Sequence, residues 1–82
     1  MTMHSEDILT IDLHAHSYML VVEQEIDRIL FRATKERKRS VRIVHGIGSG
    51  ILSQRIHELL SVHPLVRTYE REDHGGSTIV HL

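Results

Sequence analysis

The sequence predicts an α/β domain in which two helices cover one face of a four-stranded sheet. Segments in which apolar and polar residues alternate, as in strands, are followed along the chain by segments of helical periodicity. The last two strand candidates are separated by a tight turn. The chain has 82 residues, a size that fits one domain with a small core. We therefore expect a two-layer βαβαββ sandwich with a mixed sheet.

The spacing of apolar residues predicts the first strand and the first helix. Residues 9–14 read Leu-Thr-Ile-Asp-Leu-His, the alternation of a half-buried strand. Ser17 is a candidate N-cap for a helix from Tyr18 to about Arg37. The predicted buried stripe of this helix contains Val22, Ile26, Ile29, Leu30 and Ala33.

The second strand is predicted over Val41–His45, which is short and rich in β-branched residues. A strand-helix-strand unit is almost always parallel and right-handed. A glycine loop then opens a second helix, which ends at His63-Pro64 because proline disfavours helix in the preceding residue.

The chain closes with two more strand candidates, residues 65–71 and 77–82, joined by Asp73-His74-Gly75-Gly76. This turn chemistry predicts an antiparallel hairpin. The open face of the sheet would carry Thr10, Asp12 and His14 on the first strand.

Composition excludes several classes of site. Without cysteine, the chain has no disulfides, thiolate metal sites or cysteine nucleophile. No apolar run is long enough to span a bilayer, and the first four residues do not resemble the start of a signal peptide. We expect a soluble, cytoplasmic protein.

Charge is unevenly distributed although the formal net charge is only -1. Glu36 is the only acidic residue within a basic stretch that contains Arg32, Lys35, Arg37, Lys38, Arg39 and Arg42. A local basic patch can attract phosphate on a neutral protein. Alternatively, these cations belong to a solvated helix end and complement its dipole.

The glycine loop, Gly46-Ile47-Gly48-Ser49-Gly50, has the features of an anion cradle. Glycines allow backbone amides to approach a ligand closely, and the loop leads into a helix N-terminus. The loop lacks the Gly-Lys-Ser/Thr of a nucleotide-triphosphate P-loop and the GxGxxG spacing of dinucleotide folds. The alternative is a tight turn without a ligand.

His14 and His45 stand where the two parallel strands end, so they are expected at one edge of the sheet, where open α/β sheets bind ligands. Either imidazole can act as general acid or base, with Asp12 as a base or an orienting group. Both histidines can equally be exposed polar residues without a role.

A metal site is the alternative to this interpretation. The segment Asp12-Leu13-His14-Ala15-His16-Ser17 resembles the first metal motif of the polymerase-and-histidinol-phosphatase phosphoesterases. Such a site needs further ligands from later strands of a barrel, and this chain is too short for a barrel. We expect His14 and His16 not to hold a metal.

Four motifs together resemble the Smr (small MutS-related) domain family: Ile11–His14, Val41–Gly50, His63–Val66 and Gly75–Val80. The similarity covers residues 9–82 and leaves 1–8 as an N-terminal tail. It implies a fold similar to the C-terminal domain of translation initiation factor three. It also implies a nucleic-acid endonuclease, a hydrolase that nicks DNA or cuts RNA. Members of the family occur alone or fused to MutS-like ATPases, in recombination control or ribosome rescue.

The resemblance places the family's Asp-Leu-His on Asp12, Leu13 and His14, and its glycine loop on His45, Gly46, Gly48 and Gly50. The family usually has glycine after Asp-Leu-His, where this chain has Ala15. If that position needs a positive φ, alanine would be strained there.

The first hypothesis is a nuclease for RNA, or for DNA. On RNA, His14 or Asp12 would deprotonate the 2′-hydroxyl, His45 would protonate the leaving oxygen, and the amides of Gly48, Ser49 and Gly50 would hold the charged phosphate. DNA would require activated water, with a divalent ion as cofactor. The backbone would be steered by Lys35, Arg37, Lys38, Arg39, Arg42 and Arg55.

Two other hypotheses remain open from the sequence. One is a module that binds structured nucleic acid or the ribosome without cutting it, which Ala15 favours. The other is a protein-interaction domain that uses the open sheet face. No membrane partner is expected.

Overall fold

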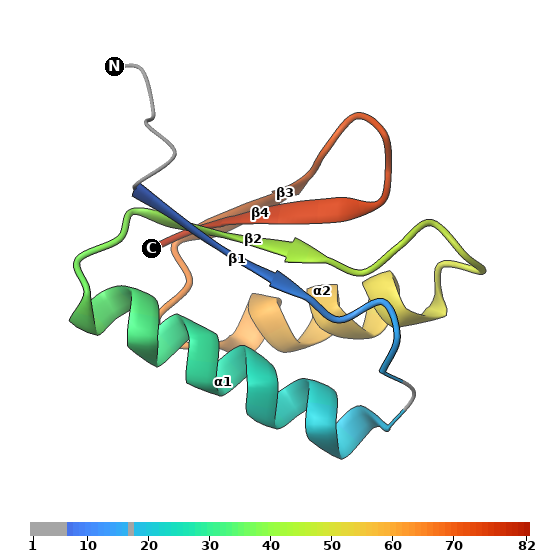
Figure 1. The fold of residues 1–82 in the computed structure, drawn as a ribbon, viewed down its shortest axis with the longest axis horizontal. Helices are drawn as coiled ribbons and strands as arrows, with labels where there is room; N and C mark the ends of the chain where they lie inside the picture. Colours follow the sequence, from blue (N-terminus) through green and yellow to red (C-terminus); the bar gives the residue numbers. More distant parts are fainter. Residues whose placement is uncertain (1–6, 17) are drawn as a thin grey trace.

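The computed structural model describes residues 7–16 and 18–82 and has the predicted order of elements (Figure 1). The elements are β1 (Ile8–Asp12), α1 (Met19–Lys35), β2 (Ser40–Val44), α2 (Ile51–Val62), β3 (Thr68–Arg71) and β4 (Ser77–His81). The strands lie in the order β1-β2-β4-β3. β1 and β2 are parallel, and β4 is antiparallel to both β2 and β3. The predicted βαβαββ fold with a mixed sheet is confirmed.

Both helices lie on the same face of the sheet, and the core fills the space between the two layers (Figure 1). All five residues of the predicted stripe on α1 are buried. They pack with the inward side chains of the strands and of α2, namely Leu13, Val41, Ile43, Val80, Ile56 and Leu60. Burial of these apolar side chains is the main favourable contribution to folding.

Several element ends differ from the sequence prediction by one to three residues. α1 begins at Met19, after Tyr18 in an extended conformation with no side-chain cap, and the predicted cap Ser17 lies outside the described residues. β3 begins at Thr68, later than predicted, because His63 organises a turn after the proline. The ring of His63 accepts a hydrogen bond from the Leu65 N–H (3.2 Å), and its carbonyl accepts one from Val66 (3.2 Å).

The described fold begins and ends on the side of the sheet where β1 and β2 start and β4 ends. The N–H of Arg39 donates to the carbonyl of Asp7 (3.0 Å), and the N–H of Leu82 donates to the carbonyl of Arg39 (3.0 Å). The connection from α1 to β2 therefore holds both ends of the described fold. Neither helix in this part of the chain is long and apolar enough to cross a membrane.

α1 ends in a Schellman turn with arginine in the position that glycine usually occupies. Lys38 donates to the carbonyl of Ala33 (2.8 Å) and Arg37 to that of Thr34 (3.1 Å). Arg37 has a φ of 59°, in the left-handed region that is unfavourable for residues with a Cβ.

We predict that Arg37→Gly stabilises the domain by about 0.5–1 kcal/mol, because relief of the left-handed strain exceeds the extra chain entropy of glycine in the unfolded state. Urea unfolding measures this difference. Arg37→Ala is the matched control, since it removes the charge and keeps the Cβ. Equal stability of the two variants would show that charge, not backbone strain, matters at this position.

Candidate nucleic-acid interface

The carboxyl ends of the parallel strands β1 and β2 lie side by side. They form the edge of the sheet farthest from Asp7 and Leu82, the first and last residues of the described fold. Their parallel pairing continues one residue past β1, where the N–H of Leu13 donates to the carbonyl of Val44 (2.7 Å). Leu13 is fully buried, so its side chain anchors this end while its neighbours Asp12 and His14 remain exposed. The predicted meeting of the two strand ends is thus observed.

Asp12 orients the imidazole of His14. One carboxylate oxygen, Oδ1, accepts hydrogen bonds from the His14 backbone N–H (3.0 Å) and from its ring Nδ1. The side-chain hydrogen bond from His14 is the largest cause that lowers the pKa of Asp12 below its usual value. Because a carboxylate can only accept, the proton of this hydrogen bond is on Nδ1, which leaves Nε2 as the ring nitrogen that faces away from Asp12 and can exchange a proton with a substrate.

The glycine loop approaches this pair closely at its first residue. Gly46 has a φ of +80°, and a Cβ at this position would lie 3.3 Å from the Cβ of His14. The N–H groups of His45 (3.0 Å) and Gly46 (2.9 Å) both donate to the carbonyl of Gly76, the residue before β4. Glycine at position 46 therefore allows the loop to lie against His14.

His45 is buried, with 4% of its surface exposed. Its Nδ1 donates to its neighbour's carbonyl, that of Gly46 (2.9 Å), and its Nε2 is 2.9 Å from the hydroxyl oxygen of Thr78. The same hydroxyl is 2.7 Å from Nε2 of His57. The ring of His45 thus links the first residue of the glycine loop to Thr78 on β4. Its role as a proton donor stays a prediction.

The loop and the connection from β1 to α1 enclose a hollow of about 280 Å³. It is lined by His14, His16, His45, residues 47–50 and the first turn of α2. Sequence reasoning weighed His16 only as a metal ligand, although its place two residues after His14 puts it in the same hollow. Among the described residues, no group of three or more His, Asp or Glu side chains is placed to hold a metal ion.

Ala15 is accommodated in the turn after His14 without backbone strain. Arg37 is the only described residue other than glycine with a positive φ, so Ala15 has an ordinary conformation. The turn is closed by a hydrogen bond from the His16 N–H to the carbonyl of Leu13 (3.0 Å). Alanine therefore does not distort the edge that carries Asp12 and His14.

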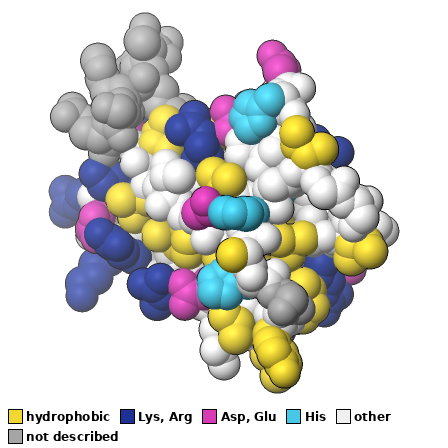
Figure 2. Space-filling model, turned by 45° about the vertical axis from the view of Figure 1, so that its right-hand side comes forward, with side chains coloured by type: hydrophobic (Ala, Val, Ile, Leu, Met, Phe, Trp, Pro, Cys, Tyr) yellow, Lys and Arg dark blue, Asp and Glu magenta, His cyan; other side chains and the backbone are white. Residues whose placement is uncertain are grey.

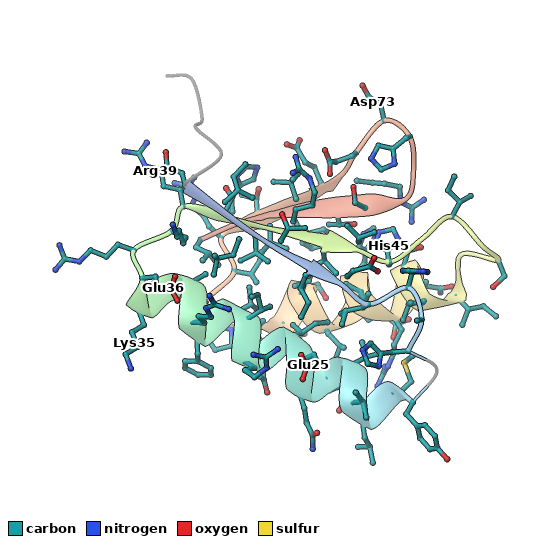
Figure 3. The ribbon with its side chains drawn as sticks, in the orientation of Figure 1. Glu25, Lys35, Glu36, Arg39, His45 and Asp73 are labelled. Atoms are coloured by element: carbon teal, nitrogen blue, oxygen red, sulfur yellow. The ribbon has the colours of Figure 1, made fainter. Side chains whose placement is uncertain are left out.

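The predicted basic residues are divided between two regions. Lys35 and Arg39 lie at the opposite end of the molecule from His45 (Figure 3). Arg37 and Lys38 lie between them in the chain, in the connection from α1 to β2. In Figure 2, exposed histidines run from the top to the lower middle of the face, with acidic side chains beside them, and the largest group of Lys and Arg lies at the left.

The other two predicted cations are paired with carboxylates. Arg42 on β2 binds Glu72 (2.8 Å). Arg55 on α2 binds Glu23 (3.1 Å) and Glu58 (3.0 Å). These pairs are partly exposed, so a phosphate can compete with the carboxylates.

Known proteins match both the sequence and the fold. The sequence profile of the Smr domain matches residues 11–82. The chain is 42% identical over 74 residues to the endonuclease MutS2 of Thermomicrobium roseum, covering 82% of this chain and 9% of that protein. It is 36% identical over 75 residues to the ribosome rescue factor SmrB of Aeromonas hydrophila, covering 88% of this chain and 42% of that protein.

A solved structure agrees with these sequence matches. The crystal structure of the Smr domain of Thermus thermophilus MutS2 superposes with a TM-score of 0.82 at 28% identity, covering 90% of this chain and 96% of that one. This chain thus spans less than half the length of the MutS2 and SmrB relatives, but nearly all of the solved domain. With the profile matching nearly the whole chain, the protein belongs to the Smr domain family.

Proposed function

We propose that this domain binds nucleic acid at the Asp12–His14 edge and cleaves phosphodiester bonds, with RNA as the favoured substrate and DNA as the weaker candidate. The observation that carries the proposal is the oriented imidazole of His14, which lies against a glycine loop at the mouth of a hollow. The names of the relatives, an endonuclease and a ribosome rescue factor, point to the same class of substrate.

On RNA the reaction needs a base, a charge stabiliser and an acid. His14 Nε2 accepts the proton of the 2′-hydroxyl, whose oxygen attacks the adjacent phosphorus. The bond from phosphorus to the 5′-oxygen breaks, which leaves a 2′,3′-cyclic phosphate and a 5′-hydroxyl. Backbone amides of Gly48, Ser49 and Gly50 stabilise the developing negative charge. His16, which lines the same hollow, is better exposed than His45 to protonate the leaving oxygen.

A second candidate function is binding without cleavage. The burial of His45 favours it, because both ring nitrogens already have partners in the fold. DNA has no 2′-hydroxyl, so its hydrolysis would require activated water and a divalent ion. Labelled RNA and DNA, incubated with and without a chelator, separate these possibilities.

We predict that His14→Ala lowers RNA cleavage about 10²–10⁴-fold, the usual contribution of a general base, while affinity changes little. Product formation from a labelled oligonucleotide measures the rate. The matched control is His81→Ala, because His81 is a partly buried histidine in β4, near the opposite edge. Cleavage by His14→Ala at the wild-type rate would contradict the assignment.

Asp12→Asn should slow cleavage less than His14→Ala, because the base remains but its orientation is weakened. It should also change stability in a pH-dependent way. The lowered pKa of Asp12 stabilises the fold fully above the ordinary carboxyl value of about 3.8, and this contribution is lost as pH falls through the lowered value. Urea unfolding at several pH values checks this. A difference between wild type and variant that persists in strong acid would exclude charge as its cause.

Replacement of Gly48 separates a binding role of the loop from a connecting role. Gly48 has a φ of +37° and no atom within 4 Å of a Cβ at this position, so a side chain fits in space but the backbone is strained. Gly48→Val should reduce cleavage or affinity about tenfold or more, since a β-branched residue shifts the loop. Asparagine tolerates this region better, so Gly48→Asn is the milder control. Unchanged activity in both variants would mean that the loop only connects β2 to α2.

A further inference from the structure

A larger cleft lies between α2 and the edge strand β3. Its volume is about 600 Å³, and its lining includes Ser49, Gln54, His57, Tyr69 and Arg71. Neither the predicted nuclease residues nor the predicted basic residues include His57, Tyr69 or Arg71. The cleft therefore has chemistry that the proposed reaction does not use.

Arg71 supplies positive charge to this cleft. Its guanidinium donates a hydrogen bond to the hydroxyl of Ser53 (3.1 Å), and no described carboxylate forms an ion pair with it. Glu58 also lines the cleft, but its carboxylate binds Arg55 (3.0 Å). An exposed guanidinium of this kind can accept a phosphate with two hydrogen bonds.

Two aromatic rings form the wall beside Arg71. The ring centroids of His57 and Tyr69 are 5.0 Å apart, with planes inclined by 36°. A hydrogen bond to Thr78 (2.7 Å) fixes the ring of His57. Burial is the first cause that lowers the pKa of His57, followed by the charges of Arg71 and His45. The lowered pKa favours the uncharged ring, and bases stack on surfaces of this type.

The cleft adjoins the hollow beside His14. Ser49, Gly50 and Ile51 line both spaces. Ser53 lines the hollow, and its hydroxyl binds Arg71 in the cleft. The two spaces therefore meet at the start of α2 and share part of their lining, so a single strand of nucleic acid that occupies one space can continue into the other.

We propose that the cleft is a second subsite for single-stranded nucleic acid, which binds a nucleotide adjacent to the reacting phosphodiester with its phosphate on Arg71 and its base against Tyr69 and His57. This inference rests on the proposed function, since it assigns a neighbouring nucleotide of the same substrate. Aromatic stacking combined with a cation is the usual means of holding single strands without sequence preference.

Binding of oligonucleotides that cannot be cleaved tests the subsite apart from catalysis. Fluorescein-labelled 2′-O-methyl uridine oligomers of two and eight residues are titrated with the full chain, and anisotropy gives Kd at several salt concentrations. Arg71→Gln should weaken binding of the octamer about tenfold and reduce the salt slope by about one. Tyr69→Leu, which keeps an apolar side chain, should weaken it about fivefold or more.

Arg67→Gln is the matched control, because Arg67 precedes the same strand but lies beside Arg39 and His81, outside the cleft. Arg67→Gln should leave the affinity for the octamer within about twofold of wild type. The affinity for the two-residue oligomer should change little in all three variants. Thermal melts confirm that each variant is folded.

The outcomes separate the two proposals. If wild type binds the octamer and Arg71→Gln behaves like Arg67→Gln, the subsite is wrong and the proposed function stands. If Arg71→Gln weakens binding but wild type cuts no unmodified RNA or DNA, the subsite is supported and the nuclease is wrong. If wild type binds no oligomer at low salt, both are overturned.

Discussion

One carbonyl oxygen, that of Gly76, receives two backbone N–H groups, from His45 and Gly46, and the geometry of the site depends on this junction. It holds the end of β2 against the start of β4. The chain then turns through the left-handed conformation of Gly46 and lies against His14. The position of the loop relative to the imidazole is therefore set by main-chain hydrogen bonds and by the φ angle of Gly46.

The elements were predictable because each has a clear period, and the parallel pairing of β1 and β2 followed from the strand-helix-strand rule. The burial of His45 was not predicted, although its alternation with Val41 and Ile43 places it on the helix side of the sheet. The cleft at Arg71 was missed because it combines α2 with β3, two elements whose contact has no local signal. For Asp12, the sequence left two roles open, as a base or as a group that orients a histidine, and the hydrogen bond to the His14 ring agrees with the second.

Much of the charge of this domain is used within the fold. Arg32 pairs with Glu36, Arg42 with Glu72, and Arg55 with two glutamates. Exposed pairs of this kind contribute little stability. Exchanging a carboxylate for a phosphate at these positions would therefore disturb the fold little, as the proposed binding of nucleic acid by a nearly neutral domain requires.

Both ends of the described fold are bound to Arg39, at the edge of the sheet farthest from His14. Asp7 and Leu82 therefore lie away from the hollow that His14 lines. A larger polypeptide can thus be joined to either end of the domain without covering the Asp12–His14 edge. This arrangement suits relatives such as MutS2, in which the matching part is 9% of the chain.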